Sequence, residues 1–188
     1  MTGTSGGRLR ALRSPRTALI IAITVTAAVA LTVIGATAGS GAPAPRDLGK
    51  AKNFTLSVLG HPGQHLSLQS MAGRPVIVNF FASWCGPCQK ETPLIARFYR
   101  ARQAQVTVVG IDVNDSSSAA QSFVRKSGVT YPVAVDPMPM KAATAYGLPG
   151  LPATFFLNAQ HTIVKRVFGA VTQAELASGA TLMTQRDR

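Results

Sequence analysis

The chain has 188 residues, of which 46% are apolar and 14% charged, and its formal net charge at pH 7 is +12. This composition supports a packed core for one domain plus an appendage, and it excludes an intrinsically disordered chain. The positive charge would suit a nucleic-acid-binding protein, but the bases are scattered and not interleaved with aromatic residues, so we expect no nucleic-acid partner.

Residues 1–17 and 18–38 have the pattern of a segment that inserts into a membrane. The first segment contains four arginines, and the second, Ala18–Ala38, contains no charged residue. Its length reaches the about 20 residues needed to span a bilayer, and bases that precede an apolar run stay in the cytoplasm. We therefore predict a single-pass signal anchor. Because Ala36-Thr37-Ala38 also fits a signal-peptidase site, a cleaved signal peptide and a secreted protein are the alternative. In both cases the rest of the chain is expected to be extracytoplasmic.

The rest of the chain is predicted to be a linker followed by one folded domain. Residues 39–50 are rich in Gly, Pro and Ala and lack apolar periodicity, as a linker does. In residues 51–188, strand-like alternation and short apolar runs take turns with the helical spacing of apolar residues. Strands that alternate with helices predict an α/β domain with a central sheet flanked by helices.

The individual elements follow from these patterns. In chain order we expect a hairpin from Phe54 to Leu68, a buried strand at Val76–Ala82, a helix that contains Leu94 to Tyr99, a strand at Val106–Val113, a helix at Ser117–Ser127, a strand at Tyr131–Val135, a short helix at Lys141–Tyr146, strands at Thr154–Leu157 and Thr162–Phe168, and a final helix from Thr172. The final helix is expected to begin there because Thr172 and Glu175 have the spacing of a capping box.

The only two cysteines, Cys85 and Cys88, lie three positions apart, and three kinds of role are open to them. A structural disulfide closing so short a loop contributes roughly 2 kcal/mol, which is little for a domain with its own core. A tetrahedral zinc site needs further ligands, and no second Cys pair or close His pair is present. Met138 and Met140 supply soft thioethers and keep a copper site open.

The third role, thiol–disulfide exchange, fits the local sequence best. The cysteines lie in Trp84-Cys85-Gly86-Pro87-Cys88, between a predicted buried strand and a predicted helix. At the start of that helix, free backbone N–H groups and the helix dipole favour a thiolate, so we expect Cys85 to be exposed and to attack. Pro87 suits the first helical turn. Cys88 lies one turn later on the same face, near enough to form a disulfide with Cys85 and to resolve the reaction.

Two motifs resemble the thioredoxin fold, the Trp84 to Cys88 motif and the downstream sequence Gly150-Leu151-Pro152-Ala153-Thr154-Phe155. The extended pattern Cys85-x-x-Cys88-x-x-Glu91-x-Pro93, behind an apolar N-terminal segment, resembles the TlpA/ResA type of extracytoplasmic thioredoxin-like protein over roughly residues 50–185. The resemblance implies a redox-active Cys85–Cys88 disulfide with no other cofactor and no metal. It also implies that Pro152 follows a cis peptide bond and faces the cysteines.

The proton acceptor departs from the pattern of cytoplasmic thioredoxins. Those proteins carry a buried Asp six residues before the first Cys, where this chain has Asn79, which cannot take a proton. Glu91 lies one helical turn after Cys88, and a partly buried carboxylate with a raised pKa can accept the Cys88 proton. We therefore predict Glu91 as the acceptor; the alternative is an ordinary Glu in the first turn of the helix. Pro93 inside the helix predicts a kink.

The resemblance implies a thiol-disulfide oxidoreductase but leaves the direction of electron flow open. Gly86 and Pro87 form the pair found in reducing thioredoxins, and no His lies between the cysteines, so we expect a reductase. The family then implies disulfide-containing clients such as apocytochrome c, whose thiols must stay free for haem, and a thiol electron donor in the membrane. A disulfide-forming oxidase, a copper-delivery protein and a non-catalytic binding domain stay as alternatives.

Overall fold

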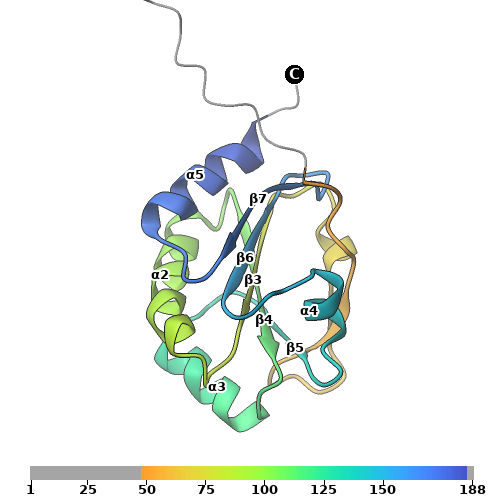
Figure 1. Ribbon diagram of the computed structural model, residues 1–188, viewed down its shortest axis with the longest axis vertical. Helices are drawn as coiled ribbons and strands as arrows, with labels where there is room; N and C mark the ends of the chain where they lie inside the picture. The colour runs from red at the N-terminus through yellow and green to blue at the C-terminus, as the bar shows by residue number, and fades with distance from the viewer. Residues whose placement is uncertain (1–47, 186–188) are drawn as a thin grey trace, which may run out of the picture. The chain divides into compact units, whose positions relative to one another are not determined.

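The computed structural model describes residues 48–185 and places seven strands in one mixed sheet with helices on both faces (Figure 1). The strand order is β2-β1-β5-β4-β3-β6-β7. β3 and β5 each pair in parallel with β4, and the other neighbours are antiparallel. The predicted α/β class is confirmed. The strands are β1 (Thr55–Val58), β2 (His65–Ser67), β3 (Val76–Phe81), β4 (Thr107–Val113), β5 (Val133–Asp136), β6 (Ala153–Leu157) and β7 (Ile163–Phe168).

The predicted basic segment, the predicted membrane segment and most of the predicted linker lie outside the described residues. Among residues 48–185, no helix has both the length and the apolarity that crossing a membrane requires. The anchor at residues 18–38 therefore stays a prediction.

The helices divide the core into two clusters, one on each face of the sheet. One face packs against α2 (Gly86–Arg102), α3 (Ser117–Lys126) and α5 (Gln173–Thr184). The other face packs against the 3₁₀ helix η1 (Leu68–Met71) and α4 (Lys141–Ala145). Figure 1 shows α2 and α5 across the sheet from α4. Side chains of β3 alternate between the two clusters, as they must in a strand that is buried on both faces.

Helix caps explain one expectation that is wrong and one that is confirmed. Leu68 does not continue the hairpin, because β2 ends at Ser67, whose side chain accepts the N–H of Gln69 at 3.2 Å and caps η1. Thr172 and Glu175 form the predicted capping box at the start of α5, each side chain accepting the other residue's backbone N–H. α2 continues past Pro93 to Arg102, so the proline does not end the helix.

The described chain begins at the edge of the sheet opposite the cysteine motif. Backbone hydrogen bonds join Leu48 and Gly49 to Ile163, the first residue of β7. At that edge β3 begins, with Val76 paired to Leu157, whereas the motif follows the other end of β3 (Figure 1). Since a strand rises about 3.3 Å per residue, the length of β3 separates the two edges by roughly 20 Å.

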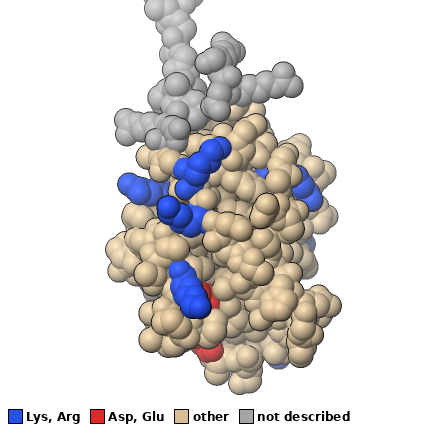
Figure 2. Space-filling model, turned by 90° about the vertical axis from the view of Figure 1, so that its right-hand side faces the viewer, with Lys and Arg blue, Asp and Glu red and all other residues tan. Residues whose placement is uncertain are grey.

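On the described part of the chain, exposed basic side chains outnumber acidic ones, in part because several of the few acidic residues are buried. The chain has 19 Lys and Arg but 7 Asp and Glu, and Glu91, Asp112 and Asp136 lie in the interior. Figure 2 shows one face on which Lys and Arg are spread and little Asp or Glu is visible. Burying a carboxyl group costs free energy unless it is hydrogen-bonded, so the surroundings of each of the three need an explanation.

Candidate active site

The cysteine pair lies where β3 runs into α2. Cys85 is the N-cap residue of α2, and Gly86 and Pro87 follow in its first turn, as predicted. The two sulfurs form a disulfide, with the Cα atoms 5.2 Å apart. The backbone N–H of Cys88 donates to Sγ of Cys85 at 3.3 Å, so this sulfur meets one of the free N–H groups of the helix start. That position favours a thiolate on Cys85 once the disulfide is reduced.

The predicted exposure of Cys85 is wrong in degree, although the order of the two cysteines is right. Cys85 is 5% exposed, and Cys88 is 0% exposed. Both side chains are covered because they belong to the core cluster beneath α2. Trp84, which is 61% exposed, is the part of the motif that protrudes into solvent.

Hydrogen bonds from two sides fix the turn that precedes the cysteines. The N–H of Ser83 donates to Oδ2 of Asp115 at 2.7 Å, and Nε1 of Trp84 donates to the carbonyl of Asn114 at 3.1 Å. From α2, Nε2 of Gln89 donates to the carbonyl of Ser83 at 2.7 Å. Because β3 and β4 are parallel neighbours, the loop after β4 lies beside the turn after β3 and holds it.

Glu91 is buried one turn after Cys88, and its carboxylate is held from two sides. Oε1 accepts Nδ2 of Asn79 at 2.8 Å, and Oε2 accepts the backbone N–H of Val171 at 2.6 Å. The same Nδ2 also donates to Oγ1 of Thr154 at 3.0 Å. The side chain of Asn79, at the position where cytoplasmic thioredoxins carry an Asp, thus orients the carboxylate that was predicted to replace that Asp.

Burial raises the pKa of Glu91 from 4.5 to about 7, because the charged form loses its hydration in the core. The hydrogen bonds from Val171 and Asn79 favour the charged form and lower the pKa in part, and the charge of Glu175 raises it slightly. Glu91 can therefore exchange a proton near neutral pH, which is what a proton acceptor for a thiol must do.

Pro152 lies at the same edge of the sheet as the cysteine motif. The Leu151–Pro152 peptide bond is cis. Pro152 is buried directly before β6, whose first residue, Ala153, pairs with Phe80 near the end of β3. The carbonyl of Pro152 accepts the N–H of Gly169 at 2.9 Å. The two thioredoxin-like motifs, far apart in the sequence, therefore meet at this edge.

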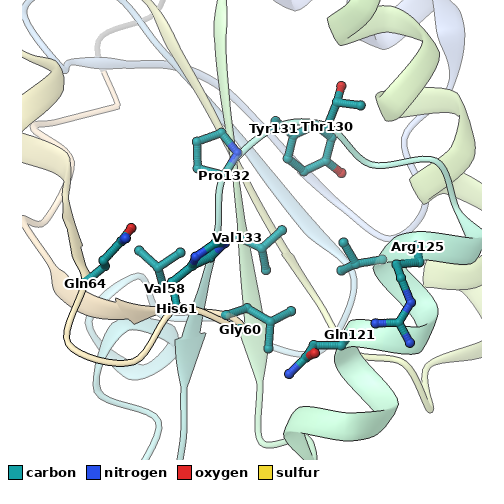
Figure 3. Close-up of a pocket in the computed structure, with 12 residues that line it drawn as sticks. Val58, Gly60, His61, Gln64, Gln121, Arg125, Thr130, Tyr131, Pro132 and Val133 are labelled. Carbon is teal, nitrogen blue, oxygen red and sulfur yellow. The ribbon is translucent and has the colours of Figure 1, made fainter.

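One pocket adjoins the cysteine motif, and a larger one does not. The first, of about 390 Å³, is lined by Trp84 and by loop residues that include Met140 and Leu151. The second, of about 510 Å³, is bordered by His61 of the β1–β2 connection and by Arg125 of α3 (Figure 3). No residue of the motif lines the second pocket. Of these two pockets, only the smaller one is lined by a residue of the motif, Trp84.

The sequence did not reveal the groups that support the predicted residues. Asn114, Asp115 and Val171 come from loops without a motif, and pairing between strands is needed to place them. Asp112, which is buried in β4, did leave a signal, since an acidic residue inside the apolar run Val106–Val113 is unusual.

Comparisons with known proteins agree with this geometry. The model of the AhpC/TSA family matches residues 49–166. Thiol-disulfide oxidoreductase ResA of Bacillus subtilis is 34% identical over 125 residues, which cover 66% of this chain and 68% of that protein. ResA of Bacillus anthracis is 30% identical over 128 residues, covering 68% of this chain and 72% of that protein.

The solved structures that resemble this chain are also thiol-disulfide exchange proteins. A secreted Mycobacterium tuberculosis disulfide oxidoreductase homologous to E. coli DsbE matches with a TM-score of 0.61 and 30% identity, covering 68% of this chain and 94% of that one. A secreted thiol-disulfide isomerase from Corynebacterium glutamicum matches with a TM-score of 0.66 and 30% identity, covering 72% and 86%. With the cysteine pair at the start of α2, these matches show that the chain belongs to the thioredoxin-like AhpC/TSA family and is a thiol-disulfide oxidoreductase.

Proposed function

We propose that the protein reduces disulfides of client proteins outside the cytoplasm, with Cys85 as the attacking and Cys88 as the resolving thiol. The observation that carries the proposal is that α2 holds a thiolate-favouring position and a buried proton acceptor on either side of Cys88. Cys85 caps the helix, where a thiolate is favoured, and a buried carboxyl with a pKa of about 7, that of Glu91, lies one turn beyond Cys88. No cofactor other than the cysteine pair is needed.

The reaction begins with a thiolate on Cys85. This thiolate attacks one sulfur of the client disulfide, the client S–S bond breaks, and the released client thiolate takes a proton from water. Cys88 then gives its proton to Glu91 and attacks Sγ of Cys85. The mixed disulfide breaks, and the second client sulfur leaves as a thiolate and is protonated. Two electrons have passed from the cysteine pair to the client, and the Cys85–Cys88 disulfide must be reduced by the electron donor.

The direction of electron flow is proposed from the residues between the cysteines. Gly86 and Pro87 place no cationic side chain beside the sulfurs, so a Cys85 thiolate has the helix start as its main stabilising influence. Strong oxidants have reduction potentials of about −120 mV and thioredoxin about −270 mV, and the difference reflects how strongly the reduced form is stabilised. We expect a potential near the thioredoxin end. A value near that of the strong oxidants, measured against glutathione, would make the protein an oxidase.

The proposed setting is the outer side of a membrane. Residues 18–38 would anchor the domain, and a thiol carrier in the same membrane would supply electrons. The apolar pocket beside Trp84 supports an extended client segment as the substrate. Among such clients, apocytochrome c fits a reductase because its two thiols must be free to bind haem. Resistance of the protein to carbonate extraction checks the anchor, and a mature N-terminus at Gly39 would contradict it.

Trapping tests the order of attack. In the Cys88→Ala variant a client bound to Cys85 cannot be released, so covalent complexes should accumulate, and mass spectrometry should identify the clients. The Cys85→Ala variant is the matched control, since it keeps one thiol at the same site and should trap almost nothing. Equal trapping by the two variants, or more by Cys85→Ala, would reverse the assignment of the two roles.

The role of Glu91 is tested in the second step. Glu91→Gln keeps the size of the side chain but cannot accept a proton, so resolution of a mixed disulfide at Cys85 should slow by about 100-fold near neutral pH. The first step should keep its rate. Rapid-mixing kinetics with a fluorescent peptide disulfide separate the two steps. A resolving rate equal to the wild type across the neutral range would leave Glu91 as an ordinary residue of the helix start.

A further inference from the structure

One buried carboxyl, that of Asp112, has no part in the proposed reaction. Asp112 lies on β4, in register with Phe81 of β3 and Val135 of β5, and is fully buried. Neither of its oxygens has a hydrogen-bond partner among the described residues. An interior carboxyl without a partner destabilises the fold, particularly when it is charged, so packing alone does not account for it.

The segment that follows Asp112 holds the redox turn. The carbonyl of Asn114 accepts the indole N–H of Trp84 at 3.1 Å. The carboxylate of Asp115 accepts the N–H of Ser83 with one oxygen and that of Ser116 with the other, both at 2.7 Å. A change within this segment therefore reaches the two residues that directly precede Cys85.

We propose that Asp112 is a positioning residue of the redox site, whose proton decides through Asp115 how firmly the Ser83–Trp84 turn is held. When Asp112 carries a proton it is neutral and can donate its O–H toward Asp115, which keeps its hydrogen bond to Ser83. When Asp112 loses the proton, two carboxylates repel each other inside the domain. Asp115 then shifts toward solvent, and the bond to Ser83 weakens.

The surroundings make this change occur near neutral pH. Burial and, to a smaller extent, the nearby charge of Asp115 raise the pKa of Asp112 from 3.8 to about 7. The neighbours in register on β3 and β5, Phe81 and Val135, are uncharged.

The charged groups on the other elements around β4 either have hydrogen-bond partners of their own or lie away from Asp112. On α2, the carboxylate of Glu91 is bound to Asn79 and to a backbone N–H. On β5, the carboxylate of Asp136 is bound to the start of α4. The bases of α3 lie in its last turn, away from the end that follows Asp115. Asp115 is thus the charged neighbour through which Asp112 acts.

The chain provides its own reporter for this proposal. Trp84 is the only tryptophan, and its indole is bonded to the segment in question. The emission of the full-length protein in detergent should be recorded from acid to alkaline pH in the oxidised state, in which the cysteines are joined and do not titrate. We expect a one-proton change in emission with a midpoint near pH 7.

Three variants distinguish the sources of that change. Asp112→Asn should abolish it and keep the low-pH emission at every pH, because the amide imitates the protonated acid. Glu91→Gln is the matched control, since its pKa lies in the same range but its contacts are elsewhere, and it should keep the change. Asp115→Asn should move the midpoint to lower pH, because the charge that raises the pKa of Asp112 is gone. A change that persists in Asp112→Asn, or that disappears in Glu91→Gln, would overturn the proposal.

A second measurement covers the case in which Asp112→Asn does not fold. In the ¹⁵N-labelled wild type, the backbone amide signal of Ser83 should titrate with the same midpoint as the ¹³C signal of the Asp112 carboxyl. If the Ser83 signal is constant while Asp112 titrates, Asp112 does not act on the turn. The proposal depends on the redox site but not on the direction of electron flow, so these results are separate from the trapping experiment.

Discussion

The two faces of the sheet differ in the carboxyl groups that they bury. The face under α4 buries that of Asp136, and the face under α2 and α3 buries those of Glu91 and Asp112. The oxygens of Asp136 accept the N–H groups of Ala142 and Ala143 at 3.2 and 2.8 Å, so this side chain satisfies two free N–H groups at the start of α4. On the opposite face, burial raises the pKa of both Glu91 and Asp112 to about 7.

The apolar packing of the two faces differs as well. Under α4, the rings of Phe80, Tyr146 and Phe155 pack together with centroids 5.0 to 5.8 Å apart. Under α2, the core cluster includes both cysteines and is interrupted by Asn79 and Glu91. The face under α2 thus combines an apolar core with buried titratable groups near the redox pair, as is common at functional sites, whereas the buried carboxyl under α4 holds the start of a helix.

The largest expected effect is a loss of stability from a substitution on the face under α4. Phe80→Ala should lower the free energy of unfolding by about 3–5 kcal/mol, because it removes a fully buried ring and leaves a cavity. Urea unfolding of the oxidised protein measures this loss. The titration of Glu91, followed by ¹³C NMR, should be the same in the Phe80→Ala variant as in the wild type. A loss below about 1 kcal/mol would contradict the expected contribution of this ring. A changed Glu91 midpoint would mean that the two faces are not independent.

The next effect concerns the pH dependence of stability. Glu91 binds its proton up to about pH 7 in the folded protein but releases it near 4.5 when unfolded. The free energy of unfolding should therefore fall as the pH rises through this interval and level off above it. The difference between 7 and 4.5 corresponds to about 3 kcal/mol.

Glu91→Gln should remove this part of the pH dependence and should be the more stable protein at alkaline pH. Denaturant unfolding at a series of pH values measures the slope for both proteins. Asp112 contributes a slope of the same sign, so the variant should keep part of it. The same slope in the wild type and in Glu91→Gln would contradict the raised pKa of Glu91.

The smallest effect should come from the residue that orients Glu91. Asn79→Ala removes a hydrogen bond that favours the charged carboxylate, so the pKa of Glu91 should rise further. Thr154→Val is the matched control, because Thr154 contacts Asn79 but has no hydrogen bond to Glu91. It should move the Glu91 midpoint less, as read from the ¹³C signal. An unchanged or lower midpoint in Asn79→Ala would remove Asn79 from this role.

The sequence predicted those parts of the site that local chemistry determines. Cys85 could be placed at a helix start because an apolar strand precedes it and Pro87 follows it, and both features act within a few residues. Glu91 could be placed next to Cys88 because helical spacing fixes that distance. Leu68 was misplaced because the side chains of Ser67 and Asn53 accept the N–H of Gln69 and start a helical turn there.

The parts that depend on strand order could not be predicted in the same way. Asn114 and Asp115 reach the redox turn only because β4 pairs in parallel with β3. Val171 lies in the connection from β7 to α5, and it reaches Glu91 only because that connection passes beside α2. The degree of burial of Cys85 likewise depends on what packs around it, and no local pattern contains that information.

The position of Leu48 has a practical consequence for handling the protein. Because the described chain enters at the edge of the sheet farthest from the disulfide, a fusion partner or solid support attached ahead of Leu48 would be joined to the domain away from the redox turn. A label or insertion between Asn114 and Ser116 would instead disturb the bonds to Ser83 and Trp84. An immobilised form of the enzyme, or a redox sensor built from it, should therefore be coupled through its N-terminal side.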